Sequence, residues 1–385
     1  MNLPEIFKLI RLTIIWLTLI FVPVWGVCYF VGFLLPWFLV EIVPGLIGQA
    51  VTPTWLMFLA DLCRFLTPIL SIMVFIPINA MFMVLFERRA LALFTVRMGP
   101  NRTGIDGLAQ TFADALKLLF KEDITPKGAD IVMFTLAPII FFAPSIFGAL
   151  PLLAAVTNNH SLFQITSIPT GIFYVLASAS VPVVALVMAG WSSNNKYSLV
   201  GGLRSAAQAI SYEIPLVLSI VTVCLLAGTL DVVQIANQQA GGILNWNILG
   251  GGALRGLDHY IAAMLQGGDT AGILATYYPH GFGSALASFV LVIATFVLAG
   301  LYLIGACAEI NRIPFDLPEA ESELVSGYNT EYSGIKFAIF FLAEFTNLFV
   351  VSSIATIMFF GGGDNIIPSY FLHNEFMQGI SSTLN

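Results

Sequence analysis

The 385-residue chain is poor in charge: Lys, Arg, Asp and Glu make up 10% of it, whereas 58% of its residues are hydrophobic. Soluble domains carry about 25% charged residues, so this composition, with a mean hydropathy of +0.90, excludes an ordinary soluble protein. Proteins cross the bilayer core only as helices or closed barrels. The apolar runs are about twenty residues long, which is the length of a helical span. We therefore predict an all-α, polytopic transmembrane bundle.

Metal-binding and catalytic patterns are equally scarce. The four cysteines lie far apart without a CxxC pair (Cys28, Cys63, Cys224 and Cys307), and the four histidines have no ligand spacing (His160, His259, His280 and His373). The chain therefore offers neither an iron–sulfur cradle nor a disulfide framework, and we expect no metal site. A phosphate loop, a dinucleotide fingerprint and a nucleophile triad are also missing. We predict no catalytic centre within this chain alone.

Seven apolar segments are predicted to span the membrane, at residues 12–35, 66–86, 131–153, 170–190, 212–230, 285–307 and 335–360. The first lacks a small-residue cleavage site and is too long for a signal peptide. Most of the 15 Lys and Arg residues fall on one set of span ends. The two exceptions are Arg64 and Arg255, which fall on the other set. Because cytoplasmic loops are rich in Lys and Arg, we expect the N-terminus and the large loops to be cytoplasmic and the C-terminus to be outside. A short surface helix is expected near 260–265.

An acidic segment, Glu309–Gly334, lies between the last two spans. It has one arginine, Arg312, and six carboxylates: Glu309, Asp316, Glu319, Glu321, Glu323 and Glu331. Pro314 and Pro318 disfavour one continuous helix, and a short helix is predicted to restart at Pro318–Leu324. A loop that served only to stay hydrated would not need the aromatic and aliphatic residues interleaved with these acids. We therefore favour a functional loop over a solvated turn.

Residues 108–121 are predicted to form an amphipathic helix that is too short and too charged to span the membrane. Its polar face carries Asp114, Lys117 and Lys121 at helical spacing. Asp114 and Lys117 are expected either to pair with each other or to point together at a bound polar headgroup. Either arrangement indicates a helix that lies on the membrane interface.

Three further carboxylates, Glu87, Glu213 and Glu344, lie in or beside spans. Glu344 follows Gly334 by ten residues, so it lies about 15 Å along its helix, near the middle of the membrane. An ionisable group at that depth is costly and is usually functional, although a structural hydrogen bond to a neighbouring helix is the alternative. With Glu87, Glu213 and Glu309, it forms a row from a cytoplasmic vestibule into the membrane. Such acids share protons readily in a low dielectric, and this row predicts a proton relay.

Three long motifs resemble one known family. In order they are ERR…RMGPNRTG…ADALKLLFKED, then SNNKYSLVGGLRSAAQAISYEIPL, then AEINRIPFDLPEAESELVSGYNTEYSG. The series resembles subunit 1 of respiratory complex I, the proton-pumping NADH:quinone oxidoreductase, in which the bacterial counterpart is the H subunit. The resemblance covers about residues 66–363.

The resemblance implies a membrane-arm subunit that forms most of the quinone chamber and begins a charge relay toward antiporter-like subunits. It implies a chamber at Arg97, Asp114, Lys117, Glu309 and Asp316. It implies proton-path acids at Glu213, Glu309 and Glu344 and a flexible acidic loop that carries Asp316, Glu319, Glu321 and Glu323. Together with Glu87 from the row of carboxylates, we predict a proton relay through Glu87, Glu213, Glu309, Glu319, Glu321, Glu323 and Glu344. The implied substrate is ubiquinone, menaquinone or plastoquinone, and iron–sulfur clusters and flavin are expected on peripheral-arm partners. An energy-transducing membrane, the bacterial plasma membrane, is the expected location, and no nucleic-acid partner is expected.

Two departures from the family pattern define the expected domains. Residues 1–65 are an addition, with an extra transmembrane helix and an external connector, and residues 364–385 form a polar tail where the family continues with further helices. Those helices are expected to be missing, fused elsewhere or supplied by another chain. Two other functions remain open: a free-standing proton-coupled transporter, against which the lack of an internal repeat argues, and the anchor subunit of a related membrane-bound hydrogenase.

Overall fold

The computed structural model describes residues 3–42, 54–157, 168–251, 264, 282–312, 314–316 and 325–363. All regular elements in these ranges are helices. Seven of the helices there are long and apolar enough to cross a membrane. This confirms the predicted all-α, polytopic fold. The short helices expected near 260–265 and at 318–324 lie outside the described residues.

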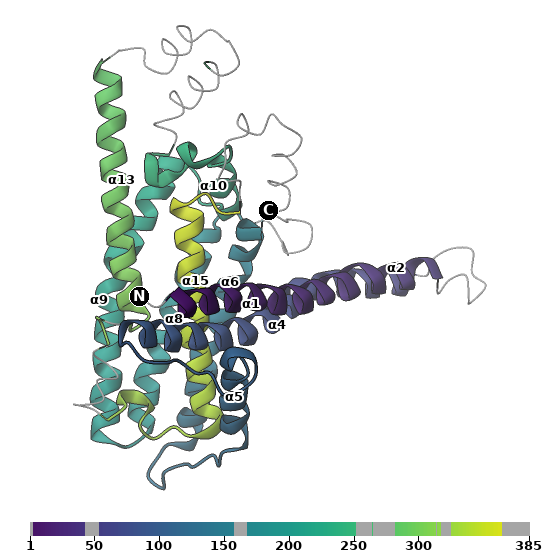
Figure 1. Cartoon of the computed structure of the whole chain (residues 1–385), viewed down its shortest axis with the longest axis vertical. Helices are drawn as coiled ribbons and strands as arrows, with labels where there is room; N and C mark the ends of the chain where they lie inside the picture. Colours follow the sequence, from purple (N-terminus) through teal and green to yellow (C-terminus); the bar gives the residue numbers. More distant parts are fainter. Residues whose placement is uncertain are drawn as a thin grey trace.

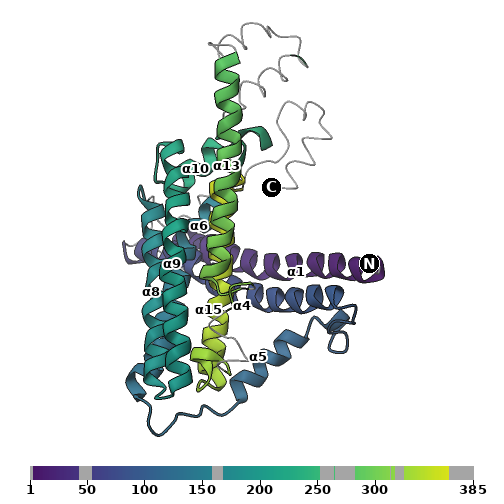
Figure 2. The ribbon, with the colours of Figure 1, turned by 90° about the vertical axis from the view of Figure 1, so that its left-hand side faces the viewer.

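Five long helices form the main bundle. They run along the long axis of the molecule in both views (Figures 1 and 2). They are α6 (Ile131–Thr157), α8 (Gly171–Ser192), α9 (Lys196–Ala227), α13 (Phe282–Glu309) and α15 (Gly334–Phe359). Helix α6 packs against α8 and α15, α8 against α9, and α9 against α13. Tyr302, Ile220 and Ile357 are buried in the core that these helices share.

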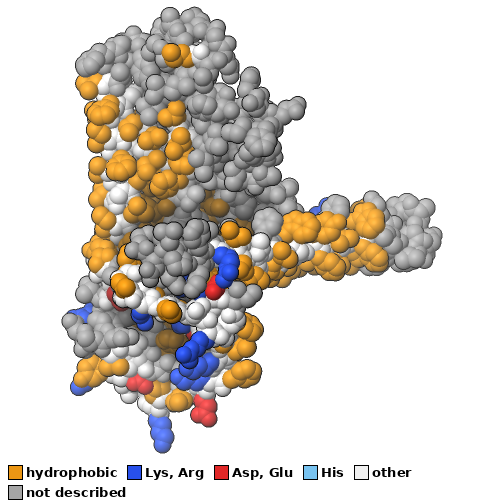
Figure 3. Space-filling view, in the orientation of Figure 1, with side chains coloured by type: hydrophobic (Ala, Val, Ile, Leu, Met, Phe, Trp, Pro, Cys, Tyr) orange, Lys and Arg blue, Asp and Glu red, His pale blue; other side chains and the backbone are white. Residues whose placement is uncertain are grey.

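The first two apolar segments form a separate pair that crosses the bundle, which we call the lateral arm (Figures 1 and 2). One rod of the arm comprises α1 (Leu3–Tyr29), η1 (Phe30–Leu34), α2 (Leu35–Trp37) and η2 (Phe38–Ile42). The other is α4 (Thr54–Phe94), whose 41 residues extend about 60 Å at 1.5 Å per residue. Apolar side chains cover the visible face of the arm (Figure 3), which suits contact with lipid.

Helix α9 begins sixteen residues before the start predicted for its span. Asn195 caps it by accepting a hydrogen bond from the Tyr197 amide (3.0 Å). Glycine lowers helix propensity, yet Gly201 and Gly202 lie inside this helix because neighbouring backbones approach there. A Cβ on Gly201 would lie 2.6 Å from the Gly327 Cα. The long loop expected here is therefore only Ser193–Asn195.

The remaining described elements are short. Helix α5 (Gln110–Phe120) confirms the predicted amphipathic helix and packs against α4 and α15. Helix α10 and four 3-10 turns complete the set: α10 (Val232–Gln238), η3 (Ile105–Gly107), η4 (Ile243–Asn245), η5 (Asn247–Leu249) and η6 (Gly327–Asn329). Helix α5 and η6 lie toward the same end of the bundle, where the candidate site is found (Figure 1).

The contact between α9 and η6 predicts that Gly201→Ala destabilises the protein. The new methyl group would meet only backbone atoms of Gly327 and Tyr328, and overpacking of this kind costs about 1–3 kcal/mol. A lowered unfolding midpoint of the purified protein in mild detergent would show the effect. Gly300→Ala on α13 is the matched control, since no atom lies within 4 Å of its Cβ position. Equal midpoints for the two variants would contradict the packing argument.

Candidate functional site

The acidic segment connects α13 to α15, and its final part is anchored to the bundle. The Ser198 hydroxyl donates to the Tyr328 carbonyl (3.1 Å), and the Asn195 amide donates to Glu331 Oε1 (2.7 Å). The Tyr332 ring stacks on Phe134 at 4.1 Å between centroids. Burial raises the pKa of Tyr332 to about 12, so its phenol is neutral and serves packing. Glu331 is thus a structural acid held by α9.

The first part of the acidic segment is held by one amide that the sequence did not single out. The Gln208 Nε2 atom on α9 donates to the Ala308 carbonyl (2.8 Å), the Asn311 side chain (3.2 Å) and the Phe315 carbonyl (2.7 Å). Asp316 follows directly and is half-buried. The one feature of the sequence that could have pointed to Gln208 is a glutamine on a helix face made otherwise of small residues. That feature does not reveal which groups the glutamine binds.

Glu87, a predicted relay acid, pairs with Arg312 across the junction between α4 and the acidic segment. The Arg312 Nη1 atom lies 3.0 and 3.1 Å from the two Glu87 carboxylate oxygens. The same guanidinium lies 4.6 Å from the centre of the Phe345 ring on α15. The carboxylate of Glu87 therefore joins α4 to the acidic segment.

Glu344 is bound by the acidic segment itself. The Tyr328 hydroxyl donates to Glu344 Oε1 at 2.6 Å. Tyr328 is fully buried and packs against Phe340, one turn before Glu344 on α15. Glu344 was singled out in the sequence, but its contact with Tyr328 was not. A shift of this segment would therefore change the surroundings of Glu344, which is half-buried.

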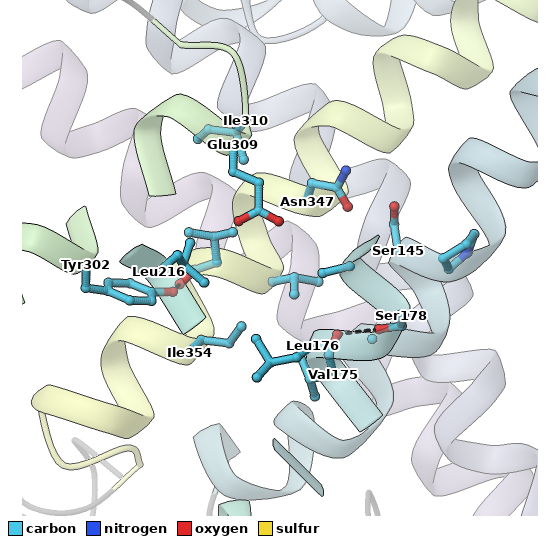
Figure 4. Close-up of a pocket in the computed structure, with 15 residues that line it drawn as sticks. Ser145, Val175, Leu176, Ser178, Leu216, Tyr302, Glu309, Ile310, Asn347 and Ile354 are labelled. Carbon is cyan, nitrogen blue, oxygen red and sulfur yellow. Dashed lines mark hydrogen bonds between the residues drawn. The ribbon is translucent and has the colours of Figure 1, made fainter. Parts of the chain in front are cut away.

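Glu309 ends α13 and points into a cavity of about 40 Å³ inside the bundle (Figure 4). A water molecule needs about 10–15 Å³ by this measure, with two to four polar partners. Polar lining comes from Ser145 on α6, Ser178 on α8 and Asn347 on α15. Leu216, Val350 and other apolar side chains complete the wall. The cavity has the size and the lining to hold water next to a carboxylate.

The other two acids predicted for the relay within spans, Glu213 and Glu344, lie on α9 and α15 and are not among the residues that line this cavity. Asn347 follows Glu344 by three residues, so both lie on neighbouring positions of α15. Gly305 lets α13 approach α9, since its Cβ position is 3.4 Å from Leu216. This contact brings Glu309 close enough to Glu213 for their carboxylates to interact electrostatically. Neither Asn347 nor the serines were expected from the sequence.

The predicted chamber residues on α5 form a second group, outside the cavity lining. Asp114 accepts hydrogen bonds from Arg88 on α4 (2.6 Å) and from Gln110 (3.2 Å). The partner of Asp114 is thus Arg88 and not Lys117, because the end of α4 passes over α5. Lys117 and Arg97 are both exposed. Glu319, Glu321 and Glu323 lie outside the described residues.

Comparison of the sequence with known proteins identifies its family. The profile of the family described as NADH dehydrogenase matches residues 67–381. The H subunit of the NADH-quinone oxidoreductase of Brevibacillus brevis is 41% identical over 297 residues, which cover 77% of this chain and 72% of that protein. Its counterpart in Caulobacter vibrioides is 38% identical over 304 residues, covering 79% and 75%. The counterpart in Bacillus cytotoxicus is 42% identical over 285 residues, covering 74% and 70%.

The chain belongs to the H-subunit family of NADH-quinone oxidoreductase. It is a membrane subunit of that multi-subunit enzyme. The family match begins one residue after the predicted boundary at 66 and runs on past residue 363. Helix α1 and the start of α4 lie outside the match, whereas every acid of the candidate site lies inside it.

The three hydrogen bonds of Gln208 predict that Gln208→Leu loosens the first part of the acidic segment. Leaving buried acceptors without a donor costs about 1–3 kcal/mol, so amide hydrogen exchange in residues 308–316 should accelerate. Exchange followed by mass spectrometry measures this directly. Gln234→Leu is the control, because that glutamine of α10 is exposed and accepts a hydrogen bond from Thr229, just before the helix (3.0 Å). Unchanged exchange in 308–316 would refute an anchoring role for Gln208.

Proposed function

We propose that this protein forms the quinone chamber with a peripheral partner and carries the first steps of a proton relay. The observation that supports this best is the double connection of the acidic segment. Through Tyr328 it binds Glu344, and its first residue, Glu309, faces the water-sized cavity. A change at the segment would therefore act on both half-buried acids together.

The quinone side of the proposal rests on α5 and the loop before it. Phe112, Leu119 and Phe120 are exposed apolar side chains on this short helix, and they suit the apolar tail of a quinone. Arg97 and Lys117 are exposed donors for the polar ring. The ion pair of Asp114 with Arg88 holds the polar face of α5 against α4.

The relay side uses groups that hold or orient protons. Reduction of a quinone to a quinol takes up two electrons and two protons, and the electrons come from iron–sulfur clusters on a partner subunit. Asp316 and Glu309 are the acids nearest the start of the segment. Asn347 and Ser145 orient cavity water beside Glu309, and Glu344 receives the proton one turn away on α15. Glu213 on α9 is the neighbouring acid with which Glu309 shares a proton.

Charge distribution supports the expected orientation. Lys and Arg side chains gather with acids at the α5 end of the molecule (Figure 3), while the described side chains that are visible along α13 are mainly apolar. The positive-inside rule makes the α5 end cytoplasmic. The peripheral arm would dock there, and other membrane-arm subunits, including antiporter-like ones, would contact the bundle within a bacterial plasma membrane.

Purification through a tag on this chain in mild detergent is expected to yield a large iron–sulfur assembly with quinone-reductase activity. Mass spectrometry identifies the subunits, and reduction of a soluble quinone analogue measures the activity. A lone protein without partners would contradict the proposal and favour a free-standing transporter. An assembly that does not reduce quinone would favour the alternative that this chain is the anchor subunit of a membrane-bound hydrogenase.

Glu344→Gln is expected to leave assembly intact and to lower the number of protons pumped per electron several-fold, because glutamine keeps the size of the side chain but cannot carry a proton. Proteoliposomes containing the purified complex give both the pumping ratio and the electron-transfer rate. Glu331→Gln serves as the control, since the contact of Glu331 with Asn195 is structural. An unchanged ratio in Glu344→Gln would remove Glu344 from the relay.

A further inference from the structure

Helix α1 lies outside the matched family region, yet it contacts the loop that leads into α5. The rod runs antiparallel to α4, with the Trp16 ring stacked on Phe82 at 4.0 Å. Closer to its start, Leu12 is buried against Leu85. Leu108, from the end of the loop, packs on the same cluster. The packing therefore joins three parts of the chain: α1, α4 and the approach to α5.

An ion pair strengthens this junction. Arg11 of α1 binds the carboxylate of Asp106, whose side chain is only 12% exposed. The Asp106 carbonyl accepts a hydrogen bond from Arg89, which also donates to the Pro100 carbonyl at 3.1 Å. Asp106 is thus held on its side chain by α1 and on its backbone by α4. The matched region supplies Arg89 and Asp106, and the added helix supplies Arg11.

The backbone of the loop needs such support. Asp106 adopts a left-handed conformation with φ of 52°, which costs free energy for a residue other than glycine. Gly107 follows with φ of 76°, and a Cβ there would lie 2.4 Å from the Pro100 carbonyl oxygen. Loss of the Arg11 contact would leave a largely buried carboxylate without its counter-charge next to this tight turn. The loop would then open more readily.

We propose that α1 is an intramolecular brace, and that Arg11 is a positioning residue for the loop 97–109 and, through it, for α5. The brace stands on the contacts of Arg11, Leu12 and Trp16. Its consequence for quinone binding rests on the proposed function, which puts Arg97 and α5 at the chamber.

The test uses Arg11→Gln, Asp106→Asn and the double variant in the purified complex. Asparagine tolerates the left-handed conformation, so Asp106→Asn removes only the charge. We expect each single variant to speed amide hydrogen exchange in 97–109 about tenfold. Exchange in the double variant should be no faster than in either single variant, because both changes remove the same contact. Arg11→Lys should keep exchange slow because it retains the charge, and Asp106→Asn alone tests the contact if Arg11→Gln fails to assemble.

Arg64→Gln is the matched control, since this arginine pairs with Asp61 at the exposed part of the same arm (3.5 Å). It should leave exchange in 97–109 unchanged. Unchanged exchange in Arg11→Gln, or additive effects in the double variant, would overturn the brace.

Quinone kinetics of the same variants test the link to function separately. A several-fold rise in KM for a soluble quinone analogue, with little change in kcat, is the result expected if the loop positions the chamber. Faster exchange with an unchanged KM would leave the brace standing and would overturn the placement of the chamber at this loop.

Discussion

A carboxylate between apolar helices has to be paired or hydrated, and the arrangement of this protein depends on that constraint. Removing one partner of a buried ion pair costs about 3–5 kcal/mol. The described acids meet the requirement in different ways: Glu87 pairs with Arg312, Glu344 accepts from Tyr328, and Glu309 faces a cavity large enough for water. Each solution joins a different pair of elements, so the acids also decide which helices must lie together.

Close backbone contacts make these solutions possible. Gly201 meets Gly327, which seats Tyr328 beneath Glu344, and Gly305 lets α13 approach α9 beside Glu213. A larger side chain at either position would separate an acid from its partner. The chain thus uses glycine within helices where helix propensity disfavours it, because the loss is offset by interhelical packing.

Helix α4 connects the two halves of the site. Its consecutive residues Glu87 and Arg88 bind different partners, Arg312 of the acidic segment and Asp114 of α5. A displacement of α5 would therefore reach the acidic segment through one rigid helix turn. The added rod α1 lies along the same helix, and its contacts near Arg89 act at this junction. The packing around α5 and the packing around the acidic segment are consequently connected through α4.

The sequence alone determined the helical class, the amphipathic helix now described as Gln110–Phe120, the family and the acids of interest, because hydropathy, helical periodicity and motif order are local properties of the chain. Only the tertiary structure decided that the first two apolar segments cross the bundle, that Gln208 holds the acidic segment, and that Asp114 pairs with Arg88 instead of Lys117. Glu87 and Arg312 are 225 residues apart in the chain. Contacts over such separations depend on how helices pack against one another, and no pattern within a single segment encodes that packing.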